Sequence, residues 1–229
     1  MPSRRFSIAL IFLLTAVGCH YVDRGVPGSG IAKTETRDVG AFEEVDFSGA
    51  GTLVLTSGEP KPLTITADDN LLPLIETTVR DGRLSIGTGQ SINPRTSLIV
   101  NAGAADIKSV SISGAATIIV TGVDNESFKI DLSGAGSIKL VGKTGRLVLS
   151  ISGAASADTI NLVARDVVVD ISGSGSANVH AVEALKANVS GSGNISYMGD
   201  PKVEQNISGV GSVRQTASPL QAETEETSR

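Results

Sequence analysis

Aromatic side chains are scarce in this sequence: Phe, Trp and Tyr make up 3% of its 229 residues, and Trp is absent. This scarcity excludes a globular core built around large aromatic anchors. Val, Ile, Leu and Ala must fill the interior instead, which suits narrow layers that repeat along an axis. The chain is long enough for one domain with a sizeable core.

Sulfur and imidazole ligands are equally rare. Cys19 is the only cysteine, so the chain forms no intrachain disulfide. His20 and His180 are the only histidines, and a typical zinc site needs more ligands than these residues supply. We therefore predict no metal site and no cofactor.

Positive charge is limited as well. The net charge is -5, and no basic cluster follows the arginine pair at the N-terminus, so nucleic acid and anionic lipid headgroups are not expected partners. Glycine pairs such as Gly173 and Gly175 lack the following helix of a dinucleotide-binding loop. No base recurs beside the repeated serines described below, so we predict no catalytic residues.

The N-terminus is typical of an exported protein. Two arginines and an apolar stretch lead us to interpret residues 1–18 as a signal peptide. The sequence Ala-Val-Gly-Cys ending at Cys19 resembles the lipobox of bacterial lipoproteins, although Ala16 stands where that motif usually has Leu. We predict that acyl chains on Cys19 attach the protein to the outer membrane, facing the periplasm or the cell surface. The alternative is ordinary cleavage after Gly18, which would give a soluble periplasmic or secreted protein.

A five-residue phrase, Ser-Gly-small-small-Ser/Thr/Asn, occurs seven times and follows an alternating apolar run each time. The last six copies start 20, 19, 20, 18 and 18 residues apart. A fixed period of this length indicates a solenoid in which each repeat stacks on its neighbour. The phrase starts at Ser48, Ser113, Ser133, Ser152, Ser172, Ser190 and Ser208.

The apolar runs alternate with period two, as in Phe128-x-Ile130-x-Leu132, so one face of each strand should point inward. Equivalent strands of successive repeats run in the same direction, which predicts an all-β, single-stranded parallel β-helix of about 18–20 residues per coil. The expected organisation is an anchor and flexible tether at residues 19–30, the β-helix at 31–217 and a disordered acidic tail at 218–229.

The region between Thr52 and Ser111 lacks the phrase, and we predict that it forms the early coils and an N-terminal cap. Within it, Asp68-Asp69-Asn70 is expected to cap a helical turn, and the Asp81-Gly82 pair predicts a hairpin.

Several segments together resemble the head GIN domain family of bacterial auto-transporter adhesins, over residues 31–215. The resemblance implies a right-handed parallel β-helix at the cell envelope. It implies no catalytic site, and no functional residue is transferred from it. The segments are the exported N-terminus, Phe42-Glu43-Glu44-Val45, Asp68-Asp69-Asn70-Leu71-Leu72, Asp81-Gly82-x-Leu84-x-Ile86 and the repeated Ser-Gly-x-Gly/Ala-x phrase.

An outward-facing position lies two residues before each repeated serine. On neighbouring coils it holds Asp131, Ser150, Asp170, Asn188 and Asn206, and we predict a binding ladder there. The simpler interpretation is a solvated hydrogen-bonding ladder in which Ser150 keeps two carboxylates apart. A third interpretation is inverting glycoside hydrolysis, since Asp131 and Asp170 would lie about 9.6 Å apart, two strand spacings.

We therefore expect an exported, lipid-anchored envelope protein that acts as a binding, adhesion or structural module. Its expected ligand is a glycan or an envelope protein, and exposed coil ends could pair copies into a homo-oligomer. The alternative function is a polysaccharide-degrading enzyme, which rests on analogy with other β-helices.

Overall fold

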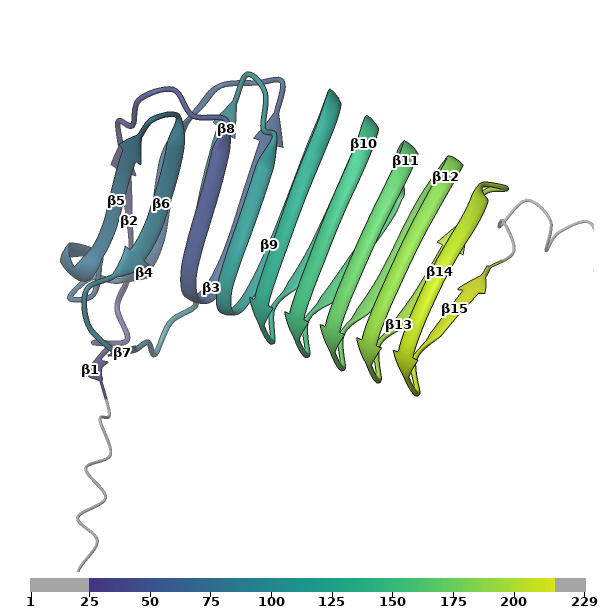
Figure 1. The fold of residues 1–229 in the computed structure, drawn as a ribbon. Helices are drawn as coiled ribbons and strands as arrows, with labels where there is room; N and C mark the ends of the chain where they lie inside the picture. Colours follow the sequence, from purple (N-terminus) through teal and green to yellow (C-terminus); the bar gives the residue numbers. More distant parts are fainter. Residues whose placement is uncertain (1–24, 217–229) are drawn as a thin grey trace, which may run out of the picture.

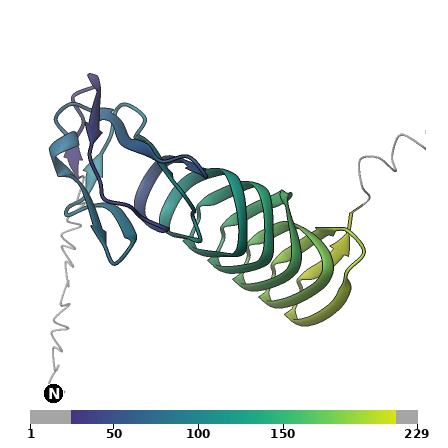
Figure 2. The same ribbon diagram turned by 90° about the horizontal axis from the view of Figure 1, so that it is seen from above.

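Short apolar runs that alternate in and out form a stack of β coils with a distinct cap at the N-terminal end (Figures 1 and 2). The computed structural model describes residues 25–216. The cap and first coil comprise β1 (Val26–Pro27), β2 (Ala32–Arg37), β3 (Glu44–Ser57), β4 (Lys61–Asp68), the 3-10 turn η1 (Leu72–Leu74), β5 (Ile75–Arg80), β6 (Arg83–Thr88), β7 (Ile92–Asn93) and β8 (Ile99–Ala104). The remaining coils comprise β9 (Ser109–Gly134), β10 (Ser137–Gly153), β11 (Ser156–Gly173), β12 (Ser176–Gly191), β13 (Asn194–Met198), β14 (Lys202–Gly209) and β15 (Ser212–Gln215).

The long strands bend around the solenoid and pair in parallel with the coils on either side. The order β3-β9-β10-β11-β12 follows the chain, and β13 and β14 both continue from β12. The register aligns the repeated serines of successive coils, for example Ser152 with Ser133 and Ser172. The predicted parallel β-helix is therefore confirmed.

The core lies inside the coils and follows the predicted alternation. Phe128, Ile130 and Leu132 are buried, and so are their counterparts on the next three coils. Thr159 is a polar exception, and its hydroxyl donates a hydrogen bond to the Asn178 carbonyl (2.9 Å). The counterparts of Phe128, Ile130 and Leu132 on the next three coils are Leu147, Leu149, Ile151, Val167, Val169, Ile171, Leu185, Ala187 and Val189.

The glycine after each repeated serine turns the chain at a corner. Gly153 has a φ of +114°, and a Cβ there would lie 2.6 Å from the Gly134 carbonyl oxygen of the preceding coil. Glycine is therefore favoured there for two reasons, the positive φ and the close approach of the neighbouring backbone. Gly136 lies two residues after Gly134 and lacks a positive φ. Buried Ala155 occupies the equivalent place on the next coil, so a positive φ is not required at this position of the repeat.

Antiparallel strands form the N-terminal cap, unlike the parallel coils. β2 pairs with β4, β4 pairs with β8, and β5 pairs with β6. Asp81 (φ 51°) and Gly82 (φ 75°) form the turn between β5 and β6, which confirms the predicted hairpin. Leu84 and Ile86 of β6 are buried against the core, so the hairpin helps to close the apolar end.

Asp68 does not cap a helical turn, and this prediction is wrong. A 3-10 turn does follow it, but no side chain caps that turn. The fully buried Asp68 carboxylate instead accepts hydrogen bonds from the backbone N–H groups of Gly30 (2.6 Å), Arg95 (3.0 Å) and Thr96 (3.1 Å). It thereby joins the N-terminal segment to the loop after β7.

The predicted flexible tether is too long at its C-terminal end. β1 pairs with β7, the Ser29 N–H donates to the Asn70 side chain (2.8 Å), and the Asn70 amide donates to the Pro27 carbonyl (2.9 Å). Residues 25–30 therefore belong to the cap. The predicted signal peptide, Cys19 and the tail at 218–229 lie outside the described residues. No helix within residues 25–216 is long and apolar enough to cross a membrane.

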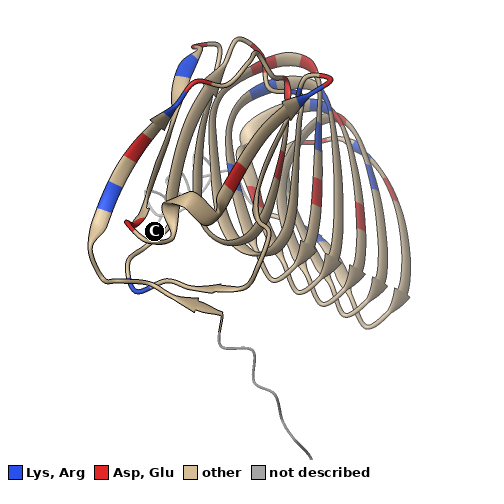
Figure 3. Ribbon diagram, turned by 90° about the vertical axis from the view of Figure 1, so that its left-hand side faces the viewer, with Lys and Arg blue, Asp and Glu red and all other residues tan. Residues whose placement is uncertain are grey.

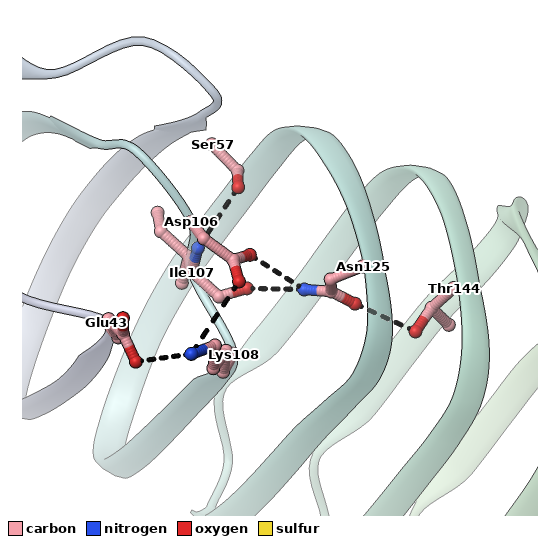
Figure 4. Close-up of polar contacts among 7 residues, drawn as sticks. All are labelled: Glu43, Ser57, Asp106, Ile107, Lys108, Asn125 and Thr144. Carbon is pink, nitrogen blue, oxygen red and sulfur yellow. Dashed lines mark hydrogen bonds and ion pairs between the residues drawn. The ribbon is translucent and has the colours of Figure 1, made fainter.

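Polar side chains link successive coils at one corner (Figure 4). The Asn125 amide donates to the Ile107 carbonyl (3.0 Å) and to the Asp106 carboxylate (3.1 Å), and the Thr144 hydroxyl donates to the Asn125 side-chain oxygen (2.9 Å). The Ile107 N–H donates in turn to the Ser57 hydroxyl (3.1 Å). These bonds fix the loop before β9 against the coils that follow it.

Candidate functional site

A shallow groove of about 450 Å³ runs over the outer face of the sheet formed by the last parts of β9, β10, β11 and β12 together with β14. Two rows of outward polar side chains line it, separated by the backbone of the inward residues Leu132, Ile151, Ile171 and Val189. One row holds Asp131, Ser150, Asp170, Asn188 and Asn206, and the other holds Ser133, Ser152, Ser172, Ser190 and Ser208.

The first row is a ladder because the strands are in register. Ser150 pairs with both Asp131 and Asp170, and Asn188 pairs with both Asp170 and Asn206. Parallel neighbours lie about 4.8 Å apart, so the ladder repeats polar atoms at that interval along the solenoid axis. We call these five residues the Asp/Asn ladder. All five predicted binding residues therefore lie together on one surface.

The charge along this face changes from coil to coil. Lys129 forms an ion pair with Asp131 (2.8 Å), while Arg83 contacts Asp46 (3.1 Å) on the first coil. The hydrogen bond to Asp46 and the nearby carboxylates of Asp46 and Glu44 raise the pKa of Arg83. Figure 3 shows that acidic and basic residues are interspersed along the ribbon of the coils.

Asp170 has a different environment. The Asn188 amide donates a hydrogen bond to one oxygen of its carboxylate (2.6 Å), and no cation forms an ion pair with it among residues 25–216. Asp170, Asn188 and Asn206 therefore form the part of the ladder with the most hydrogen-bonding capacity. Together they offer amide donors and carboxylate and carbonyl acceptors to a ligand.

The second row is the part of the site that the sequence argument did not assign. The repeat identified the serines, but it gave no reason to expect them beside a hollow. The regular strand alternation places each serine two residues after a ladder residue, on the same face. This two-residue spacing is the sequence signal from which the serines could have been assigned to the same surface as the Asp/Asn ladder.

The other candidate residue, His180, is not among the residues that line the groove. His180 pairs with Val163 and Met198 on neighbouring coils. Within the described residues, no group of three His, Cys, Asp or Glu side chains could hold a metal ion. Asp131 and Asp170 lie two coils apart with Ser150 between them, and Asp131 is already paired with Lys129.

A family model described as "Putative auto-transporter adhesin, head GIN domain" matches residues 41–201. The chain belongs to the head GIN domain family. The match covers the chain from before β3 to the end of β13, which includes part of the cap and the coils that carry most of the groove, and it confirms the resemblance found in the sequence. The description of the head GIN domain family supports a role in binding or adhesion rather than catalysis.

Solved structures share the fold of this head GIN domain. A "putative adhesin" from Bacteroides fragilis aligns with a TM-score of 0.68 at 21% identity, over 84% of this chain and 100% of that chain. A "putative adhesin" from Parabacteroides merdae aligns with a TM-score of 0.53 at 25% identity, over 84% and 99%. A "putative lipid binding protein" from Parabacteroides distasonis gives 0.51 at 22% identity, over 84% and 99%. No curated protein matches the chain.

Proposed function

We propose that this protein is an envelope-attached binding module whose groove receives an extended, hydroxyl-rich glycan. The observation that carries the proposal is the in-register Asp/Asn ladder beside a row of serines along a groove of about 450 Å³. The hydroxyl groups of a glycan recur along its length, so they could hydrogen-bond to the polar side chains that recur from coil to coil along the groove.

The chemistry of the groove supports a weak, extended contact. Its lining contains no aromatic side chain, so sugar rings would gain little from stacking. Each coil would instead contribute hydrogen bonds from Asp, Asn and Ser, and several coils or several copies would act together to give useful avidity. This mode of binding agrees with the adhesin description of the family.

The direct test is titration of cell-wall glycans and polysaccharides against the wild-type chain and against Asp170→Ala and Asn188→Ala. These two residues hydrogen-bond to each other on adjacent coils, and each variant should weaken binding by about tenfold, which corresponds to a lost net hydrogen bond of about 1.4 kcal/mol.

Asp124→Ala is the matched control. This carboxylate is strongly exposed, pairs with Lys143 (3.2 Å) and lies outside the groove. The control should bind like the wild type. Equal binding by Asp170→Ala, Asn188→Ala and the wild type would show that the ligand uses another surface, and absence of binding to all glycans would remove the proposal.

Attachment through Cys19 is the second part of the proposal. Its support is the lipobox-like sequence before Cys19 and the adhesin family, since adhesins act at the cell envelope. Cells that express the full chain and receive an alkyne-labelled fatty acid should incorporate the label, and Cys19→Ala should abolish the incorporation. Label retained by Cys19→Ala would refute acylation at this residue.

Polysaccharide cleavage is the alternative function, motivated by the two strand spacings of about 9.6 Å between Asp131 and Asp170, which is close to the upper limit of about 9.5 Å for inverting hydrolysis. The ion pair of Asp131 with Lys129 favours binding over catalysis. Incubation of the same polysaccharides with and without calcium separates the two functions. Cleavage that Asp131→Asn and Asp170→Asn both abolish would establish the enzyme.

A further inference from the structure

The two ends of the solenoid differ. At the C-terminal end, β14 pairs with β12 along one edge, and no strand within residues 25–216 pairs with its other edge. Val203 and Ile207 are 36% and 37% exposed, whereas their partners on the preceding coil, Leu185 and Val189, are 1% and 2% exposed. The described residues therefore leave both a strand edge and the end of the core uncovered.

The backbone groups on this free edge can be assigned. The register aligns Glu204 with Lys129 through successive coils, and the Lys129 N–H donates to the Lys108 carbonyl of the preceding coil (2.8 Å). Backbone groups alternate in direction along a strand. The backbone N–H and C=O groups of Glu204 therefore point toward β12. Those of Val203, Gln205 and Ile207 point away from β12, toward the free edge, where they can hydrogen-bond to another strand.

The N-terminal end does not offer a parallel coil edge that would continue the helix, because its outermost strands, β2 and β5, pair antiparallel with β4 and β6. There the antiparallel strands β2 and β4 cover the first coils, so one molecule cannot stack head-to-tail on the next as a continuous parallel helix. The β14 edge can instead pair with itself through a two-fold axis. Such pairing closes at two copies.

We propose that β14 pairs antiparallel with β14 of a second copy, with Gln205 on the two-fold axis. In this register Val203 lies opposite Ile207 of the other copy, and the outward-directed N–H and C=O groups of both strands face each other. On the outer face Glu204 lies opposite Asn206, and Lys202 lies opposite Ser208. No like charges meet, and the exposed ends of the two cores cover each other.

This arrangement would place the two grooves on the same face of one continuous sheet. Asn206 and Ser208 belong to β14 and end the two polar rows of one copy. In the antiparallel register they lie opposite Glu204 and Lys202 of the second copy, so the two grooves are offset along the strands by about four residues, or about 13 Å. The inference rests on the edge of β14 and does not depend on whether the groove binds a glycan.

The chain outside the described residues offers the competing occupant. β15, the last described strand, pairs with β13 and not with β12 or β14. Residues 217–229 follow it in the sequence, carry Glu223, Glu225 and Glu226, and show no alternation of apolar residues. These features favour a second copy over the tail as the partner of β14.

Sedimentation equilibrium of the chain from His20 to Arg229, which contains every described residue, tests the proposal. The wild type should have twice the monomer mass. Gln205→Pro removes an N–H from the free edge and leaves the bonds to β12 intact, so it should weaken dimerisation by at least about tenfold, a change of about 1.4 kcal/mol. Gln205→Ala keeps that N–H and is the matched control, which should remain dimeric.

Ile207→Lys provides a second disrupting variant in case proline disturbs the last coil, and far-UV circular dichroism checks that each variant is folded. Monomeric Gln205→Pro and Ile207→Lys beside a dimeric control would support the pairing. A monomeric wild type, a dimer that neither variant weakens, or open-ended polymers would overturn it. Dimerisation only after removal of residues 217–229 would likewise overturn it, because the tail would then be the natural occupant.

Discussion

At the scale of single residues, two corner glycines allow the cost of a positive φ to be measured separately from the cost of a backbone collision. Gly153 and Gly49 have similar φ values of +114° and +124°. A Cβ on Gly153 would lie 2.6 Å from the Gly134 carbonyl oxygen, whereas no described atom lies within 4 Å of the Cβ position at Gly49, on the first coil. A residue with a Cβ would therefore have a strained φ at both positions, but it would collide with a neighbouring coil only at Gly153.

We predict that Gly49→Ala lowers the free energy of unfolding by about 1–3 kcal/mol, the usual cost of backbone strain. Gly153→Ala should lower it further, because the carbonyl of the preceding coil must also move. Urea unfolding of both variants measures the difference. Equal losses would mean that the collision relaxes at no cost and that the recurring glycine of the repeat is required for φ alone.

Asp68 is the residue whose environment differs most from that of a surface carboxylate. Burial alone would raise the pKa of Asp68, but hydrogen bonds from the backbone N–H groups of Thr96, Gly30 and Arg95 outweigh burial and lower the pKa. A lowered pKa in the folded state means that Asp68 stabilises the fold at neutral pH. This contribution is lost as the pH falls below the ordinary carboxyl pKa of about 3.9 and through the folded value.

We therefore predict that Asp68→Asn lowers the melting temperature by several degrees at pH 7, because an amide NH2 then faces backbone donors. The difference from the wild type should shrink as the pH approaches 3. Asp69→Asn is the control, since Asp69 accepts a hydrogen bond from the exposed Ser29 hydroxyl (2.5 Å) and not from this buried cluster. A difference that stays constant with pH would indicate that the charge of Asp68 does not contribute.

At the scale of elements, the corner network around Asn125 joins three segments, which are the loop before β9, β9 itself and β10. Asn125 in β9 bridges the loop before β9 to Thr144 in β10 (Figure 4). Asn125→Ala would leave the buried Thr144 hydroxyl and the Ile107 carbonyl without these partners. We predict a loss of about 1–3 kcal/mol in the free energy of unfolding.

Asn161→Ala is the matched control for this network. Asn161 lies in β11 at a similar corner and is exposed, so its replacement should change stability by less than about 0.5 kcal/mol. Urea denaturation gives both values. If the two variants were equally stable, water would satisfy the groups that Asn125 joins.

The sequence predicts regular elements better than contacts between them. The alternation at Phe128, Ile130 and Leu132 predicts the buried face, and Asp81-Gly82 predicts the hairpin, because both signals lie within a few residues of the structure that they specify. Asp68 resembles a helix cap in the local sequence. Its true partners Gly30, Arg95 and Thr96 are 38, 27 and 28 residues away, and no local pattern indicates them.

The groove was predictable only in part, for the same reason. The repeat period places Asp170 and Asn188 on adjacent coils, and the register confirms their alignment. The hollow itself depends on how the sheet bends beside the serine corners, which is a property of several coils together. The free edge of β14 likewise depends on where the last coil ends.

At the scale of the whole molecule, a solenoid is stabilised mainly by contacts between neighbouring coils, so its stability varies along the axis. β10 and β11 have a coil on each side, whereas β14 has one neighbour within the described residues. The residues of β14 are exposed throughout. The last coil should therefore open first, and the central coils should open only with most of the fold.

Amide hydrogen exchange measures this gradient. We predict the strongest protection in β10 and β11 and the weakest in β14 and β15 when the protein is dilute. Raising the protein concentration should protect the amides of Val203, Gln205 and Ile207, because a second copy would then occupy the edge to which they point, while the protection of β10 should stay unchanged. Uniform protection of all coils would show that the solenoid opens as a single unit, and protection of β14 that does not depend on concentration would show that its edge is covered within one chain.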